Sequence, residues 1–149
     1  MKRIFIDQDK CEGCKNCSIA CMQAHRERPG TVYDLDLGDP KNEARHTIIQ
    51  SETGGYFPLF CRHCPEPECV IACMSGALQK DAGTGQVQYD EKRCGSCFMC
   101  VMSCPFGNIK PDWAHAKIVK CDFCKNDKEG PNCVKSCPQK AIHVEEAAV

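Results

Sequence analysis

The chain has 149 residues, with 16 cysteines, 7% aromatic residues and a formal net charge of −1. So much cysteine beside so few aromatic side chains excludes an ordinary small hydrophobic domain and indicates a fold held together by cross-links or metal. The balanced charge argues against a nucleic-acid-binding protein, because such proteins carry a basic excess.

The start of the sequence bears on the compartment in which the thiols act. The segment MKRIFID is too short and too soon charged to be a secretory signal. There is also no run of about 18 apolar residues that would span a membrane. We therefore expect a cytoplasmic protein, in which thiols stay reduced and dense cysteine patterns are more often metal sites than disulfides.

The predicted secondary-structure elements are short. In chain order, strands are predicted at 4–6, 47–50 and 87–89, and helices at 17–25 and 97–103. A Gly-Thr-Gly turn at 83–85 precedes the third strand. Several Pro and Gly turn signals surround the strand in 26–56, which predicts a loop insertion with a hairpin. The expected fold class is α+β, with short strands, short helices and long cysteine-rich loops.

The cysteines fall into four groups of four. They are Cys11, Cys14, Cys17 and Cys21; Cys61, Cys64, Cys69 and Cys73; Cys94, Cys97, Cys100 and Cys104; and Cys121, Cys124, Cys133 and Cys137. The first and third groups share the spacing C-x2-C-x2-C-x3-C, and the others differ only in the middle gap. IFIDQDKCEGC also matches VQYDEKRCGSC, and CVIACMSGAL matches CVKSCPQKAI. The chain therefore contains internal repeats.

The run CGSCFMCVMSCP indicates an iron–sulfur site. Three closely spaced thiolates can hold three corners of a [4Fe–4S] cubane, and the fourth, one helical turn further on, ligates the other cluster of a pair. A proline after the last cysteine ends the short helix. Pro105 and Pro138 occupy that position, where the first two groups have Met22 and Met74. Sixteen ligands divide into four complete cubanes, which leaves no cysteine as a redox nucleophile.

Zinc and disulfides are the alternative uses of these thiols. Zinc sites use two cysteine pairs separated by a dozen or more residues, and a third cysteine with only two residues between it and the second has no role in a tetrahedral site. A cluster-based sensor would need an output module such as a basic helix-turn-helix, and an enzyme would need an open coordination site. The sequence offers neither, so electron transfer is the favoured function.

Three segments resemble the four-cluster iron–sulfur electron-transfer subunits of the dimethyl-sulfoxide reductase type. They are CRHCPEPECVIACMSGAL, RCGSCFMCVMSCPFG and VKCDFCKNDKEGPNCVKSCPQKAI. Small soluble relatives of that family serve carbon-monoxide dehydrogenases, hydrogenases, formate dehydrogenases and tungsten aldehyde oxidoreductases. The resemblance covers nearly the whole chain except residues 26 to 56.

The resemblance implies which cysteines share each of four [4Fe–4S] clusters, because in that family the first group pairs with the fourth and the second with the third. The four implied sets are Cys11, Cys14, Cys17 and Cys137; Cys121, Cys124, Cys133 and Cys21; Cys61, Cys64, Cys69 and Cys104; and Cys94, Cys97, Cys100 and Cys73. One bacterial-ferredoxin-like module is then nested in another. The outer module is 1–25 plus 109–149, the inner module is 57–108, and 26–56 is the insertion.

The implied function is electron transfer and not catalysis. The protein would pass single low-potential electrons between a catalytic oxidoreductase subunit, of one of the types above, and a second electron carrier in anaerobic metabolism. Neither nucleic acid nor a membrane span is implied. The identity of the partner enzyme and the stacking of copies into longer assemblies are left open.

Other residues are candidates for adjusting the clusters. His63 is a candidate donor of an N–H hydrogen bond to cluster sulfur, the alternative being an ordinary packed histidine. Four clusters of about −2 each would bring the folded chain to about −9, so nearby cations have charge to offset. Those cations are Lys10, Lys15, Arg62, Arg93, Lys120 and Lys135. Met22, Met74, Met99 and Met102 are expected to form apolar wrapping around the clusters. Trp113 is expected to be a surface or interface anchor.

Overall fold

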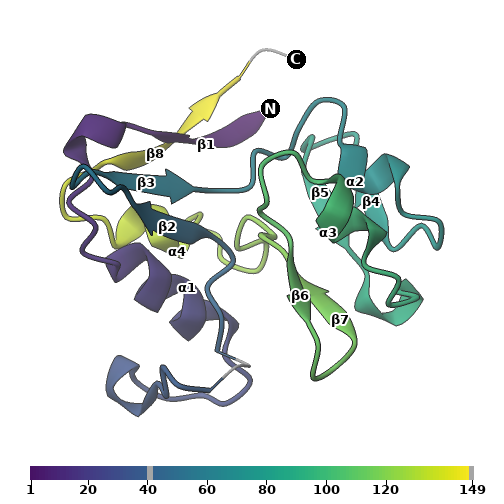
Figure 1. The fold of residues 1–149 in the computed structure, drawn as a ribbon, viewed down its shortest axis with the longest axis horizontal. Coiled ribbons are helices and arrows are strands. Elements are labelled where there is room, and N and C mark those ends of the chain that lie inside the picture. The colour runs from purple at the N-terminus through teal and green to yellow at the C-terminus, as the bar shows by residue number, and fades with distance from the viewer. Residues whose placement is uncertain (40–41, 148–149) are drawn as a thin grey trace.

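Two lobes lie side by side in the computed structural model, which describes residues 1–39 and 42–147 (Figure 1). The strands are β1 (Lys2–Ile6), β2 (Thr47–Gln50), β3 (Tyr56–Leu59), β4 (Leu78–Lys80), β5 (Val87–Tyr89), β6 (Lys110–Asp112), β7 (Lys117–Val119) and β8 (Ile142–Glu146). The α-helices are α1 (Asn16–His25), α2 (Glu68–Ile71), α3 (Met99–Ser103) and α4 (Asn132–Lys135). Short 3-10 turns are η1 (Gln8–Lys10), η2 (Val32–Asp34) and η3 (Glu91–Arg93).

The first lobe joins the two ends of the chain. Strand β1 pairs antiparallel with β8, with Ile4 opposite Val144, and α1 packs against α4. The β2–β3 hairpin lies beside this pair (Figure 1). The buried core of the lobe is Ile4, Cys17, Phe60, Phe123, Cys133 and Ile142. Two of these six residues are cysteines, so the core and the thiol sites share side chains.

The second lobe is built in the same way from the middle of the chain. Strands β4 and β5 form an antiparallel hairpin, and α2 packs against α3. The β6–β7 hairpin extends from this lobe (Figure 1). The buried core is Leu78, Val87, Cys100, Ile109 and Ile118.

The sequence repeats reappear as repeats of backbone conformation. Turn η1 and turn η3 occupy equivalent positions before the first and third cysteine groups. Lys15 and Phe98, which are equivalent in the repeat, both have left-handed backbone, with φ of 60° and 56°, immediately before α1 and α3. Helices α2 and α4 each follow a proline and have the same length. The repeat therefore preserves how each cysteine run folds.

Proline placement decides how far two of the helices extend. Helix α3 ends at Ser103, just before Cys104 and Pro105. In the equivalent position after Cys21 the chain has Met22, and α1 continues to His25. Because a proline ring cannot continue the helical hydrogen-bond ladder, its absence gives α1 an extra turn. That turn carries His25 toward the thiols of the first lobe.

The structure differs from the sequence-based expectations in three details. Helix α3 begins at Met99 and not at 97. The second strand of the predicted hairpin, Tyr56–Leu59, continues past the expected end of the insertion at 56. Ile109 and Ile118, expected in the outer module, are buried in the second-lobe core, because the unpredicted β6–β7 hairpin packs there. Parts of the expected ranges 26–56 and 109–149, at 40–41 and 148–149, lie outside the described residues.

Replacing Leu78 with alanine tests the second-lobe core. Leu78 is 1% exposed, so we expect Leu78→Ala to lower the free energy of unfolding by about 2–5 kcal/mol through lost burial and a residual cavity. Chemical denaturation of oxygen-free protein, followed by circular dichroism, measures this. Ile71→Ala is the matched control, because Ile71 is 71% exposed in α2 and its loss should change stability by less than about 0.5 kcal/mol. Equal effects of the two substitutions would contradict this assignment of the core.

Candidate metal centres

A cavity in the first lobe is lined by four thiols. Cys11, Cys14 and Cys17 come from the loop after η1 and the first turn of α1, and Cys137 follows α4. The empty space is about 390 Å³, its mouth included, and its exposed wall is almost entirely apolar. Three cysteines of the first group are therefore gathered with the last cysteine of the fourth group.

A glycine allows the loop of this cavity to pass under the β2–β3 hairpin. Gly13 has φ +67°, and a Cβ atom there would overlap the ring of Tyr56 on β3. A larger residue would have to push the loop that carries Cys11 and Cys14 away from the strand. The glycine thus fixes the approach of the loop to its lobe.

A second cavity, in the other lobe, repeats this arrangement. It is lined by Cys61, Cys64 and Cys69, from the segment leading into α2, and by Cys104, which follows α3. The empty space is about 360 Å³, its mouth included, again with a mainly apolar wall. His63 and Val87 also line it. Here the second group is gathered with the last cysteine of the third group.

For the remaining cysteines, the effects of neighbouring thiols on pKa values indicate which of them lie close together. Burial raises the pKa of Cys133 far above its usual value, and the thiols of Cys121, Cys21, Cys124 and, more weakly, Cys17 add to this shift. Burial likewise raises the pKa of Cys100 to about 11, with smaller contributions from the nearby Cys73 and Cys97 thiols. Cys94 is half-buried.

Two thiols, Cys21 and Cys73, have pKa values that are lowered from the usual value of cysteine. Burial would raise the pKa of Cys21, but hydrogen bonds from His25, His46 and the Arg45 backbone N–H lower it to about 6. The Arg45 nitrogen lies 3.3 Å from Cys21 Sγ. Burial is also opposed at Cys73, where donors including the Leu78 N–H, 3.4 Å from Sγ, lower the pKa. Each is the last cysteine of its group, and in each the hydrogen bonds favour the thiolate, the form that binds metal.

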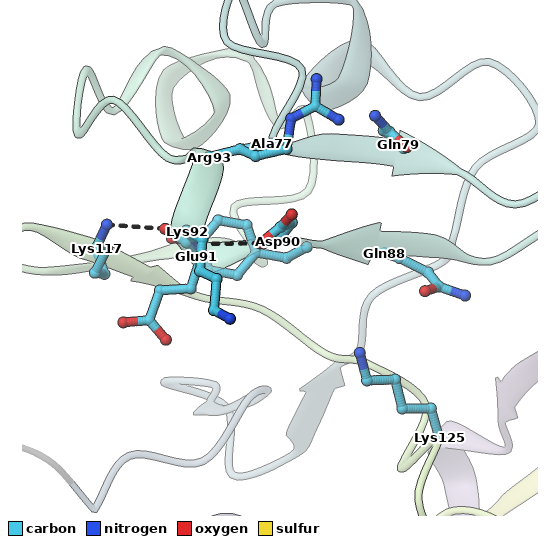
Figure 2. Close-up of a pocket in the computed structure, with 10 residues that line it drawn as sticks. Ala77, Gln79, Gln88, Asp90, Glu91, Lys92, Arg93, Lys117 and Lys125 are labelled. Carbon is cyan, nitrogen blue, oxygen red and sulfur yellow. Dashed lines mark hydrogen bonds between the residues drawn. The ribbon is translucent and has the colours of Figure 1, made fainter.

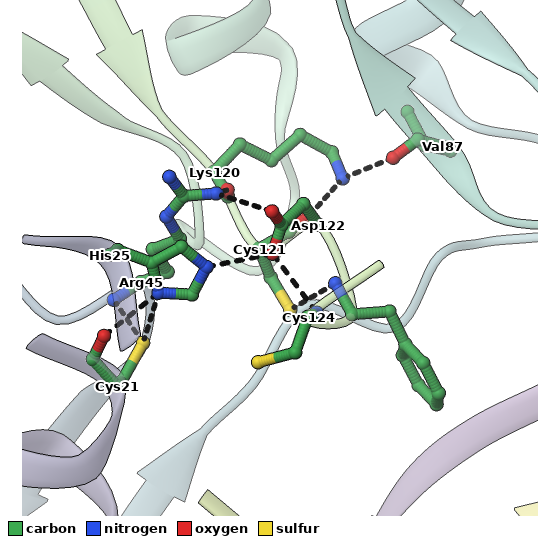
Figure 3. Close-up of polar contacts among 9 residues, drawn as sticks. Cys21, His25, Arg45, Val87, Lys120, Cys121, Asp122 and Cys124 are labelled. Atoms are coloured by element: carbon green, nitrogen blue, oxygen red, sulfur yellow. Dashed lines mark hydrogen bonds and ion pairs between the residues drawn. The ribbon is translucent and has the colours of Figure 1, made fainter. Parts of the chain in front are cut away.

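A polar network surrounds Cys21 and the fourth group (Figure 3). His25 Nδ1 donates to the Cys21 carbonyl oxygen at 2.8 Å, and its Nε2 donates to Asp122 Oδ1 at 3.0 Å. Arg45 is ion-paired with Asp122 at 3.1 Å, and the Cys124 N–H donates to the same carboxylate. Burial and the Arg45 charge oppose a positive charge on His25, yet its hydrogen bonds to the Asp122 carboxylate and the Cys21 thiol raise its pKa to about 10.

Sequence reasoning missed this network. His25, Asp122 and Cys124 place three potential metal-binding atoms within 4.8 Å of one another. However, both ring nitrogens of His25 already donate hydrogen bonds, so the imidazole has no free lone pair for a metal. The group therefore orients the neighbouring cysteines. The spacing of His25 four residues after Cys21, on one helix face, was the available signal.

The expected apolar wrapping by methionines is wrong for three of the four residues. Met74 is 92% exposed, Met102 is 82% exposed and Met99 is 49% exposed, whereas Met22 is half-buried. Helices α2 and α3 are only about one turn long and lie at the surface of their lobe, so these side chains project outward. Trp113 is on the surface as expected, 73% exposed, and its ring lies tilted against that of Phe98 with 4.6 Å between centroids.

The candidate cations divide into exposed and buried ones. Lys10 and Lys135 form surface ion pairs with Asp7 and Asp127, and Arg62 lies over the ring of Phe106. Lys120, in contrast, is only 3% exposed. The position of Lys120 next to Cys121 in the sequence did not reveal that it would be buried while the other candidate cations are not.

A large open groove is lined by residues of the second lobe and by Lys117 and Lys125 (Figure 2). It runs along β4 and β5, and no cysteine lines it. Its charged residues include Asp90, Glu91, Lys92, Arg93 and Lys117, of both signs. Lys117 donates to the Glu91 carbonyl oxygen, and Asp90 accepts from the Lys92 N–H, so these contacts organise turn η3.

Cavities lined by thiols, each with three cysteines from one short run and a fourth from a distant run, are typical of an iron–sulfur protein of the ferredoxin type. Within this class the protein belongs to the 4Fe-4S dicluster domain family, which its residues 53–147 match. The family resemblance inferred from the sequence is thereby confirmed. In the described part of the chain, none of the helices has the length and apolar character that crossing a bilayer requires.

The relatives of the protein include subunits of oxidoreductases. It is 34% identical over 145 residues to the B subunit of anaerobic dimethyl sulfoxide reductase from Escherichia coli (strain K12), a match that covers 93% of this sequence and 70% of that subunit. It is 35% identical over 142 residues to the NADH-dependent phenylglyoxylate dehydrogenase subunit beta of Aromatoleum evansii. That match covers 93% of this sequence and 29% of the subunit, so the protein spans less than a third of that relative.

A solved structure has a related fold. One polypeptide of the active site complex BamBC of benzoyl coenzyme A reductase, in complex with benzoyl-CoA, is 28% identical, with a TM-score of 0.55. The alignment covers 97% of this sequence and 79% of that polypeptide. The α+β character with short helices and strands agrees with this likeness.

Removal of iron should unfold the protein. Cys17, Cys100 and Cys133 are core residues, so losing the metal bonds that we expect them to make would separate segments that the small cores hold only weakly. We expect oxygen-free treatment with a strong chelator to abolish most of the far-ultraviolet circular dichroism signal and to expose thiols to a labelling reagent. Adding iron and sulfide back should restore the signal. An unchanged spectrum after complete iron loss would contradict this dependence.

Proposed function

We propose that the protein carries four [4Fe–4S] clusters and passes single low-potential electrons between a catalytic oxidoreductase subunit and a second electron carrier, without being a catalyst itself. The observation that carries this proposal is the composition of the two thiol cavities. Each contains three cysteines of one group and the last cysteine of its partner group. These are two of the four ligand sets that the family resemblance implies.

The other two ligand sets complete the proposal. Cys121, Cys124 and Cys133 are proposed to share a cluster with Cys21, since the pKa of Cys133 responds to the other three thiols as well as to burial. Cys94, Cys97 and Cys100 are proposed to share one with Cys73, and Cys73 and Cys97 are electrostatic neighbours of Cys100. All sixteen cysteines would then be ligands.

The proposed modules are nested as the family resemblance implies. Support comes from β1 pairing with β8 and α1 packing on α4, which bring 1–25 together with the C-terminal segment. The middle of the chain has its own pair of helices, α2 and α3, and its own core. We count the β6–β7 hairpin with the inner module, because Ile109 and Ile118 belong to that core.

The residues around each site have defined tasks. When bound, a [4Fe–4S] cluster supplies reversible one-electron chemistry, with a potential set by hydrogen bonds, charge and burial. The cysteines hold the iron, and the apolar cavity walls keep water from it. Backbone N–H groups of Arg45 and Leu78 donate to Cys21 and Cys73, which stabilises negative charge on those sulfurs.

The proposed partner is a catalytic oxidoreductase subunit. The support is that relatives are named as subunits of dimethyl sulfoxide reductase and phenylglyoxylate dehydrogenase. Partners of the carbon-monoxide dehydrogenase, hydrogenase, formate dehydrogenase and aldehyde oxidoreductase types remain part of the proposal. So does a cytoplasmic location, which suits a protein whose sixteen cysteines are all free thiols.

A metal inventory tests the cluster count. We expect oxygen-free protein to contain about 16 iron atoms per molecule with little zinc, and Cys69→Ser to lose about four of them. Mass spectrometry of the metals, together with electron paramagnetic resonance, measures both. Met74→Leu is the control, because Met74 follows a proposed ligand but is 92% exposed. Zinc in place of iron would make the protein a structural scaffold.

A second prediction concerns the last cysteine of a group, which is proposed to bind the cluster of its partner group. Cys21→Ser should damage the cluster held mainly by the fourth group, and Cys17→Ser the cluster held mainly by the first. Resonance spectra of the two variants, compared with those of Cys14→Ser and Cys133→Ser, identify the signal that each removes. If Cys21→Ser and Cys14→Ser removed the same signal, the proposed pairing would be wrong.

A further inference from the structure

Lys120 is a buried cation at the boundary between the lobes. Its side chain is 3% exposed, and its Nζ donates to the Val87 and Cys121 carbonyl oxygens, at 2.8 Å each (Figure 3). Val87 lines the cavity of Cys61, Cys64, Cys69 and Cys104, whereas Cys121 belongs to the fourth group. The ammonium group therefore lies between two proposed clusters.

Among the described residues, none of the carboxylates lies within ion-pair distance of this charge. The ion pairs there involve other lysines, arginines and histidines and leave Lys120 without an acidic partner. Two carbonyl oxygens alone are poor compensation for a desolvated ammonium group, which costs several kcal/mol to bury unpaired. Under the proposed function, the negative charge that compensates Lys120 comes from the two anionic clusters on either side of it. Consistent with this, the charge of Lys120 opposes the effect of burial on the pKa values of both Cys69 and Cys121.

His63 supplies a second polar group at the same place. It is 2% exposed, and its Nδ1 accepts from the Val87 N–H at 2.9 Å. Because Nδ1 accepts, the proton of the neutral ring is on Nε2, and this buried N–H has no acceptor among the described residues. The ring lines the cavity of Cys61, Cys64, Cys69 and Cys104, so a cluster sulfur there is the missing acceptor.

We propose that Lys120 and His63, bound to the backbone C=O and N–H of Val87 respectively, form a buried polar junction that stabilises the reduced state of the cluster at Cys61, Cys64, Cys69 and Cys104. This inference rests on the proposed function. The cluster would gain one electron from a one-electron donor and later pass it to an acceptor. No proton is transferred, and no bond is made or broken. The added negative charge is met by the ammonium group and the N–H donor. The junction therefore raises the midpoint potential of this cluster. Lys120 acts through its charge and His63 through its N–H group.

Charge removal at Lys120 tests the junction. Lys120→Gln keeps hydrogen-bond donors for the two carbonyls but loses the charge, and Lys120→Arg keeps the charge. We expect Lys120→Gln to lower the reduced-to-oxidised ratio of one resonance signal at least tenfold at fixed potential, which is about 59 mV for one electron. Lys120→Arg should retain most of the wild-type ratio. The measurement is an oxygen-free redox titration with dithionite, with iron counted in each sample.

Lys110 provides a matched control. Its Nζ also donates to two backbone carbonyls, of Ala44 and His46, but it has an acidic partner, Glu43, at 3.0 Å. Lys110→Gln should leave every cluster potential unchanged. A purely structural role for Lys120 predicts similar small effects at both positions, with potentials unmoved.

Removal of the N–H donor at His63 gives a second test. His63→Phe keeps the edge-on ring contact with Phe123, whose centroid lies 5.8 Å away, and removes the donor. It should lower the potential of the same signal as Lys120→Gln, and it supplies the test if Lys120→Gln does not retain its iron. Full iron content with unchanged potentials in both variants would overturn the junction and leave the proposed function intact. Wild-type protein without reducible clusters would instead refute the proposed function.

Discussion

Ligation of thiols to iron is the interaction on which both lobes depend. Each lobe has a small core, with six buried residues in one cluster and five in the other among those described, and cysteines are part of both. Cores of this size do not order long loops without additional cross-links. The thiol cavities lie against these cores, so metal binding and folding are one process. The same apolar surroundings that complete each core also keep water from the metal.

Internal repetition explains how one short polypeptide builds the same kind of site more than once. Equivalent positions keep left-handed backbone, as at Lys15 and Phe98 and again at His63 and Phe123. These turns are what direct closely spaced cysteines toward a common centre. Differences between the repeats arise where side chains outside the motif intervene. The extra turn of α1, for example, gives the first lobe the His25–Asp122–Arg45 network, for which the second lobe uses other donors.

Buried polar groups and backbone atoms connect the two lobes. Strand β5 contributes one residue, Val87, whose backbone N–H binds His63 and whose carbonyl oxygen binds Lys120. Phe123 of the C-terminal segment packs edge-on against His63. A change at this boundary would therefore reach the environment of cysteines in both lobes. Such coupling suits a protein whose proposed task is to move electrons between sites held by different segments.

Local spacing in the sequence determined the metal chemistry, the repeats, the strands at 4–6, 47–50 and 87–89, and the proline-limited end of α3, because each depends on residues within a few positions. Only the tertiary structure decided which thiols share a cavity, such as Cys137 with Cys11, and that Lys120 is buried while Lys10 is exposed. It also decided the outward position of Met74 and the packing of Ile118. These outcomes depend on contacts between segments far apart in the sequence, which the spacing of neighbouring residues does not encode.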